Sequence, residues 1–187
     1  LFNQFPKKIN EINLVYIPTI ETKSLSQFIH SFFSTVHACL SNYDVILYLN
    51  VANGPFGFIT KLFNIPTAIN VDGLEWLRPK WKGIASKYFK FSAKLSTLFI
   101  DKIITDSFEM QKIYLKYFKK NSVVIAYGPN KMYLKKSKIL NKFNLKCRNF
   151  FLIIGRLIPD NNADIILKEF LNSNSKKKLV IVGDVPY

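Results

Sequence analysis

The chain has 187 residues, of which 49% are hydrophobic and 21% charged, so it is long enough for one complete domain or for parts of two. Its two cysteines, Cys39 and Cys147, lie far apart without metal-ligand spacing, so no disulfide framework is implied and a reducing cytosol fits. No apolar run reaches the roughly 18 residues that a membrane-spanning helix needs. Because the chain starts at Leu1 and stops just after an apolar strand, we expect a fragment of a longer protein.

The net charge of +15 favours an anionic partner, and three kinds compete: nucleic acid, an anionic membrane surface and an anionic small substrate. A genome whose base composition enriches Lys, Asn, Ile and Phe would produce the same bias without any function.

The first third of the chain alternates strands and helices. We predict a strand over 12–17, a helix over 24–40 from its apolar spacing, and a strand over 44–49 of the kind buried on both faces of a parallel sheet. In the turn after that strand, Asn53 is expected to cap a helix with Pro55 in its first turn. Asn53 and Gly54 would then lie at a helix N-terminus suited to anions.

A dense polar and aromatic stretch follows the next predicted strand, over 66–71. Ligands of open α/β sheets bind beyond the carboxyl ends of the strands, where Asp72 is expected to stand. Gly73 would allow the backbone to turn. The loop wall would be formed by Glu75, Trp76, Arg78 and Trp81.

The predicted helix over 84–99 places Ile84, Tyr88, Phe91, Leu95 and Leu98 on one apolar face and three lysines on another. A strand over 101–105 follows. Next comes a helix capped by Asp106, with Glu109 completing a capping box. The series ends with a strand over 123–126. His30 and His37 are interpreted as ordinary helix residues.

A second unit begins after residues 131–148, which contain seven bases and no acid and are interpreted as a linker. It comprises a strand over 150–154, a Gly155-Arg156 loop, a helix over 164–171 and a strand over 179–182. This alternation predicts an α/β protein with mostly parallel sheets. The chain has neither a Gly-x-Gly-x-x-Gly sequence nor a phosphate-binding Lys loop, which disfavours dehydrogenases and P-loop enzymes.

Four short motifs of the sequence belong together: Val71-Asp-Gly-Leu-Glu-Trp76, Lys80-Trp81, Ala126-Tyr-Gly128 and Gly155-Arg-Leu-Ile-Pro-Asp-Asn-Asn162. Together they resemble glycosyltransferase family 4, and within it the bacterial rhamnosyltransferases of capsular and exopolysaccharide synthesis. The resemblance spans roughly residues 44–187.

The resemblance implies a GT-B fold with two Rossmann-like domains, both incomplete here. Residues 1–130 would form the acceptor-side domain, 131–148 the basic linker and 149–187 the start of the donor domain. It also implies a retaining transferase that uses a nucleotide-diphospho-sugar such as dTDP-rhamnose, without a metal or a further cofactor. The acceptor would be a lipid-diphosphate-linked sugar at the cytoplasmic face of the membrane, and nucleic acid would not be a partner.

The donor-site residues follow from the same resemblance, whereas Asp72 and the acceptor-site candidates follow from their positions beyond the strand ends. Arg156 matches the arginine that holds the donor diphosphate, with Gly155 and Gly183 beside it, and Asp72 is the catalytic candidate. The acceptor site would contain Asn53, Gly54, Gly73, Glu75, Trp76 and Arg78.

The chain also departs from the family pattern. Asp160-Asn161-Asn162 replaces a Glu-Lys-Gly sequence whose Lys binds phosphate. The family's Glu-x7-Glu motif would lie beyond residue 187, and its glycine-rich loop would lie before residue 1. We therefore expect the fragment to be inactive alone.

Two other functions stay open at this stage: a nucleic-acid-binding α/β module, and another Rossmann-type sugar-nucleotide enzyme such as an epimerase. A membrane-docking surface is also predicted, because Trp76 and Trp81 favour a bilayer interface and accompany a group of bases: Arg78, Lys80, Lys82, Lys87, Lys90 and Lys94.

Overall fold

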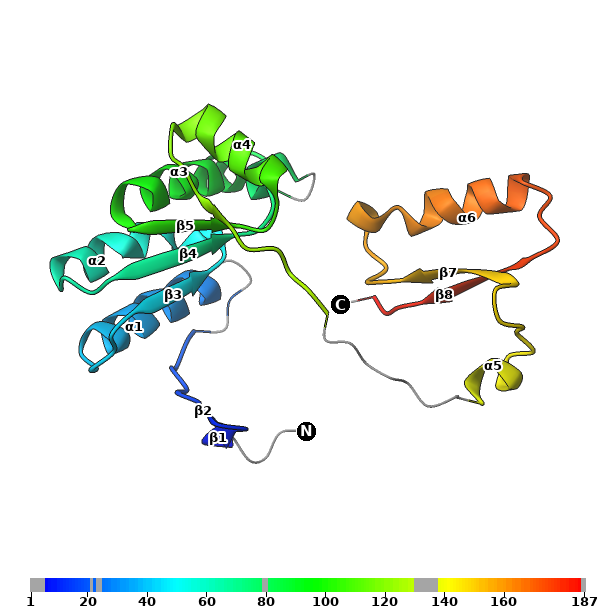
Figure 1. Ribbon diagram of the computed structural model, residues 1–187, viewed down its shortest axis with the longest axis horizontal. Coiled ribbons are helices and arrows are strands. Elements are labelled where there is room, and N and C mark those ends of the chain that lie inside the picture. The colour runs from blue at the N-terminus through cyan, green and yellow to red at the C-terminus, as the bar shows by residue number, and fades with distance from the viewer. Residues whose placement is uncertain (1–5, 21, 23–24, 79–80, 130–137, 186–187) are drawn as a thin grey trace. The chain divides into compact units, whose positions relative to one another are not determined.

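The computed structural model describes residues 6–20, 22, 25–78, 81–129 and 138–185. It has two units (Figure 1): the elements from β1 to β6 belong to the first, and those from α5 to β8 belong to the second.

The first unit is built on a four-stranded parallel sheet with the order β3-β4-β5-β6. The strands are β3 (Ile46–Leu49), β4 (Thr67–Val71), β5 (Lys102–Thr105) and β6 (Val123–Val124). Strands that are adjacent in both sequence and space, with right-handed connections, place the connecting helices on one face of the sheet. Ile69 and Ile103 are accordingly buried beneath the helices.

Burial of β3 on both faces, which we predicted, is wrong. Tyr48 is buried and its hydroxyl lies 3.2 Å from Thr35 Oγ1 of the first helix. Leu47 and Leu49 alternate with Tyr48 along the strand and are exposed. Alternate strand residues point to opposite faces, so only the Tyr48 face is covered by described elements.

The helices of the first unit include two short 3-10 segments. They are α1 (Ser26–Cys39), η1 (Val51–Phe56), α2 (Gly57–Leu62), η2 (Glu75–Leu77), α3 (Ile84–Phe99) and α4 (Phe108–Phe118). The core between them and the sheet is formed by Tyr48, Val51, Ala52, Phe56, Ile69, Val71, Trp76, Phe89, Ala93, Ile100, Ile103, Met110 and Tyr114.

Helix α3 buries a different face from the one predicted. Its inner face carries small residues, among them Ser92, Ala93 and Ser96, whereas Ile84 and Phe91 of the predicted apolar face are exposed. The reason is a close approach of η1. A Cβ built on Gly54 would lie 2.2 Å from the Ser92 carbonyl oxygen, so only small side chains fit between the two segments.

Two helix caps also differ from the predictions. Asn50, not Asn53, caps η1: its Oδ1 accepts from the Ala52 N–H at 2.9 Å, and its φ of 86° is one that Asn tolerates. Ser107, not Asp106, caps α4 by accepting from the Met110 N–H at 3.4 Å. Several neighbouring residues in each turn are of types that can cap a helix. The residue that does so is determined by where the backbone leaves the strand and the helix begins.

The predicted strand over 12–17 is also wrong. Its described counterpart is β2 (Ile12–Asn13), which pairs antiparallel with β1 (Lys8–Ile9) in a small hairpin. The remaining residues leave the hairpin, and Tyr16 donates its hydroxyl to the Pro6 carbonyl oxygen at 2.8 Å. The chain therefore bends away before a longer strand can pair.

The second unit consists of one βαβ arrangement preceded by a helical turn. Its elements are α5 (Ile139–Lys142), β7 (Phe150–Ile154), η3 (Pro159–Asn161), α6 (Ala163–Asn172) and β8 (Lys178–Val182). Strands β7 and β8 pair in parallel, and no side chain in the described part of this unit is fully buried.

The other predicted elements are confirmed to within two residues at each end. Of the segment predicted as a linker, 131–137 lies outside the described residues, whereas Ile139–Lys142 forms α5. Ser24, Lys80 and Asn130 also lie outside the described residues. The exact domain bounds stay a prediction.

Candidate functional site

Polar side chains gather at the carboxyl edge of the first unit's sheet. Asn50, Asp72 and Asp106 directly follow β3, β4 and β5, and Tyr127 lies beyond β6. Because all four strands run in parallel, these positions share one edge, which is where open α/β sheets bind ligands.

Asn70, the penultimate residue of β4, connects this edge across the sheet. Its Nδ2 donates to the Tyr127 hydroxyl. Its Oδ1 is buried and accepts no hydrogen bond from any described residue, and the same is true of Asn53 Oδ1. Asn53 is held by its own Nδ2, which donates to the Leu49 carbonyl oxygen at 2.8 Å. Both amides at this edge therefore bond through their nitrogens, while their buried oxygens have no partner among the described residues.

Asp72 is exposed at the end of β4 and lies near a buried phenol. Tyr114, on α4, is 0% exposed, and its hydroxyl has no partner among the described residues. Burial and, to a smaller extent, the negative charge of Asp72 raise the pKa of Tyr114. Asp72 therefore lies close enough to the Tyr114 hydroxyl for its negative charge to disfavour the ionised phenol.

The loop after Asp72 is held in place by buried side chains. Gly73 has a φ of 69°, which favours glycine. The buried carboxylate of Glu75 accepts from Trp81 Nε1 at 2.7 Å. Trp76 is buried, with ring centroids 6.4 Å from Tyr114 and 5.9 Å from Phe118.

These contacts give Glu75 and Trp76 a supporting role, which leaves their predicted contact with an acceptor untested. Arg78 follows η2 and is half-buried, and its acceptor role is likewise untested. Gly54 is explained by the packing of η1 on α3 without any ligand.

A second candidate region is the loop after β7. The Gly155 N–H donates to the Val182 carbonyl oxygen at 3.0 Å, and the Leu157 N–H donates to the Asp184 carbonyl oxygen at 2.9 Å. A Cβ on Gly183 would lie 1.9 Å from the Gly155 carbonyl oxygen. Glycine at position 183 therefore allows the residues after β7 and after β8 to approach each other closely.

Arg156 is at the tip of this loop. Its carbonyl oxygen accepts from Asn161 Nδ2 at 2.6 Å, which joins the loop to η3. Its side chain is exposed, and its guanidinium has no hydrogen bond or ion pair with another described residue. A guanidinium can bind a phosphate group through two parallel hydrogen bonds. A hydrogen-bonded backbone that carries an exposed guanidinium therefore suits a phosphate ligand.

Comparisons with known proteins agree with this fold. Residues 43–130, just under half of the chain, match a family model described as a domain of unknown function, DUF1972. Among solved structures, the chain is similar to a sucrose-phosphate synthase from Thermosynechococcus elongatus, with a TM-score of 0.66 and 16% sequence identity. The match covers 90% of this chain and 44% of that chain. No curated protein matches the chain significantly.

The structural match confirms the predicted fold class. The chain is an α/β protein with parallel sheets of the GT-B type. At this identity the similarity establishes the fold alone, and the chain spans less than half the length of the protein that it resembles.

Metal-binding groups and membrane spans were also sought within the described part of the chain. No group of three or more His, Cys, Asp or Glu side chains there could hold a metal ion. None of the described helices has both the length and the apolar character to cross a bilayer. Cys39 is buried and Cys147 exposed, and both are free thiols; burial raises the pKa of Cys39.

Sequence reasoning missed Asn70 and Tyr127 as site residues. Tyr127 belongs to one motif of the family resemblance and Asn70 directly precedes another, but their roles depend on a contact between residues 57 apart. The available signal was the polar Asn70 one residue before the end of an otherwise apolar strand.

Proposed function

We propose that the chain is part of a glycosyltransferase that moves a sugar from a nucleotide-diphospho-sugar to a hydroxyl acceptor. The observation that carries the proposal is the loop of Arg156: a clamped backbone with an exposed guanidinium at the carboxyl end of a parallel strand. The GT-B type of fold, with a neighbour named as a sucrose-phosphate synthase, supports a sugar-transferring activity.

Arg156 would stabilise the leaving group. When the bond between the sugar carbon and the diphosphate oxygen breaks, the electron pair stays on the nucleoside diphosphate and negative charge develops there. A positioned cation that meets this charge contributes about 10²–10³ in rate. The guanidinium keeps its charge throughout the working pH range.

Asp72 would act on the transferred sugar or the acceptor. The acceptor oxygen forms the new bond to the sugar carbon, and its proton must leave. Asp72, at the end of β4, would accept a hydrogen bond from this hydroxyl or from the sugar, as an orienting group or as a base.

The finer assignment rests on the family resemblance. The resemblance implies retention of configuration, dTDP-rhamnose as donor and a lipid-diphosphate-linked sugar as acceptor, in the synthesis of a surface polysaccharide. The enzyme would work at the cytoplasmic face of the membrane, without a metal.

An assay of the full-length protein with a panel of nucleotide sugars and a lipid-diphosphate sugar acceptor tests the proposal. We expect sugar transfer from one donor, and its loss in Asp72→Asn at an unchanged melting temperature. Asp44→Asn is the matched control, because Asp44 is exposed before β3 at the opposite edge of the sheet.

Full activity of Asp72→Asn would remove Asp72 from the chemistry. No transfer from any donor, combined with salt-dependent binding of oligonucleotides, would instead support the alternative of a nucleic-acid-binding module. Conversion of a nucleotide sugar without transfer would support another sugar-nucleotide enzyme, such as an epimerase.

A further inference from the structure

The outer stripe of α3 carries large apolar side chains where a solvent-facing helix surface would carry polar ones. Ile84 is 87% exposed, Phe91 57% and Leu98 56%. The inner face is formed instead by Phe89 and by small residues, among them Ser92 and Ala93. The stripe is about 21 Å long, from 14 helical rises of 1.5 Å. An apolar stripe of this length marks a surface that is covered in the working protein.

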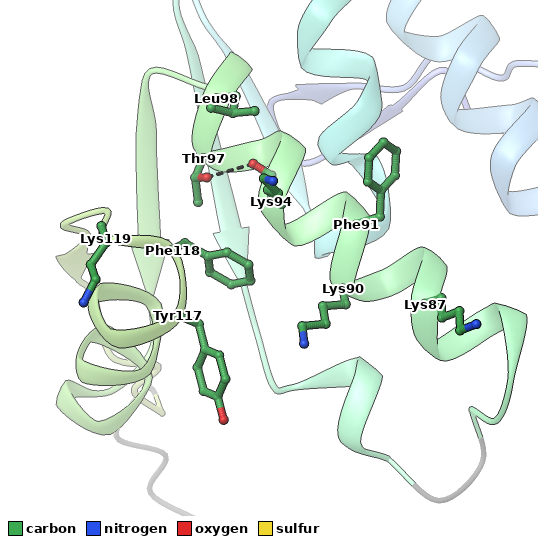
Figure 2. Close-up of a pocket in the computed structure, with 9 residues that line it drawn as sticks. All are labelled: Lys87, Lys90, Phe91, Lys94, Thr97, Leu98, Tyr117, Phe118 and Lys119. Carbon is green, nitrogen blue, oxygen red and sulfur yellow. Dashed lines mark hydrogen bonds between the residues drawn. The ribbon is translucent and has the colours of Figure 1, made fainter.

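A groove between α3 and α4 runs beside this stripe, with a volume of about 540 Å³ (Figure 2). Phe91 and Leu98 of α3 line it together with Tyr117 and Phe118 of α4. This groove and the outer stripe of α3 are called the α3–α4 surface from here on.

Lysines surround the apolar residues. Lys87, Lys90 and Lys94 of α3 and Lys119 after α4 line the groove, and all four are exposed. No acidic residue is among the described residues that line it. The occupant must therefore be anionic and must also accept apolar side chains.

The tryptophans predicted to anchor a membrane do not belong to this surface. Trp76 is buried in the core, and Trp81 is half-buried, with its ring centroid 4.9 Å from that of Phe89. The exposed apolar groups are Ile84, Phe91 and Leu98 instead. A membrane anchor on this helix would thus use residues that the sequence pattern had assigned to the core.

We propose that the α3–α4 surface docks on an anionic lipid bilayer, with Ile84, Phe91 and Leu98 entering the interface and the lysines contacting the headgroups. Protein interfaces are depleted in lysine and enriched in arginine, whereas this surface has four lysines and no arginine among its described lining residues. A second copy of the chain would bring like charges together. A helix that combines an apolar stripe with lysines binds the surface of anionic bilayers.

Sedimentation with vesicles tests the proposal without any assay of activity, so its outcome is separable from that of the proposed sugar transfer. We expect the chain to bind vesicles of 70% phosphatidylcholine and 30% phosphatidylglycerol at low salt, and to bind pure phosphatidylcholine vesicles much more weakly. Each lysine near the surface contributes about 1 kcal/mol. The combined variant Lys87→Gln, Lys90→Gln and Lys94→Gln should therefore bind about 100-fold more weakly.

Two further variants separate docking from a general effect of charge. Replacing Lys61, Lys102 and Lys168 with Gln removes the same charge from other exposed positions and should reduce binding far less. Phe91→Ser should weaken binding about tenfold, with the melting temperature unchanged because Phe91 is exposed.

Three results would overturn the proposal. The first is equal loss of binding in the two triple variants. The second is absence of binding to both kinds of vesicle, which would point to an acidic protein as the occupant. The third is stronger displacement by sodium phosphate than by sodium chloride at equal ionic strength, which would indicate a site for a single phosphate group.

Discussion

The two units differ in how completely they bury their apolar side chains. The first covers one face of a four-stranded sheet with helices and buries a contiguous core that includes Tyr114 and Ile69 at 0% exposure. The second pairs two strands against one helix and buries no described side chain fully. Because burial of apolar surface is the main favourable term in folding, most of the folding free energy of this chain is expected to come from the first unit.

The difference also separates two kinds of candidate site residue. In the first unit Gly54, Glu75 and Trp76 have packing partners that account for them. In the second unit Arg156 has none among the described residues, although its backbone is held. A site residue without a structural explanation is the stronger functional candidate.

The largest expected effect is on the core. Trp76→Ala should lower the free energy of unfolding by about 3–5 kcal/mol, because it leaves a cavity beside Tyr114 and Phe118. Phe151→Ala in the second unit should cost less than about 1 kcal/mol, because Phe151 is half exposed. Chemical denaturation of both variants measures this contrast, and similar losses would show that the second unit is packed as tightly as the first.

The second largest loss of stability is expected where η1 and α3 are in close contact. Gly54→Ala should cost about 1–3 kcal/mol, because the added Cβ meets the Ser92 carbonyl oxygen on a packed backbone. Gly128→Ala is the control, since nothing lies within 4 Å of its Cβ position. If both variants melted at the wild-type temperature, the close packing described here would be incorrect.

The smallest expected effect is a gain in stability. Tyr114→Phe should stabilise the chain by about 1 kcal/mol, because a buried hydroxyl without a partner costs about 1–3 kcal/mol. Tyr48→Phe should destabilise it by a similar amount, because it removes the hydrogen-bonding partner of Thr35. A loss of stability in Tyr114→Phe would show that this hydroxyl is satisfied in solution.

The elements could be predicted from the sequence because their signals are local. The continuous apolar run of β7 and the helical spacing of α3 each determine an element without reference to its surroundings. The inner face of α3 could not be predicted, because it depends on how closely η1 approaches through Gly54. The caps at Asn50 and Ser107 could not be predicted either, because they depend on where the backbone turns. Neighbouring polar residues could cap the same helices equally well.

The site could be predicted only in part for the same reason. Asp72 is the first residue after β4 and Arg156 the second after β7, so their places at strand ends can be read from the sequence. The bond between Asn70 and Tyr127 joins segments far apart in sequence, and the supporting contacts of Glu75 and Trp76 appear only in three dimensions.

The central claim is that Arg156 holds the diphosphate of a nucleotide sugar. The most direct test is the dissociation constant of dTDP-rhamnose, measured by calorimetry for the full-length protein, for Arg156→Ala and for Lys176→Ala, a control that removes an exposed charge from the same unit. We predict that Arg156→Ala binds the donor about 30- to 150-fold more weakly, which corresponds to about 2–3 kcal/mol for charge-assisted hydrogen bonds, while Lys176→Ala binds as the wild type does. Equal affinity in all three proteins, or no binding by the wild type, would contradict the account.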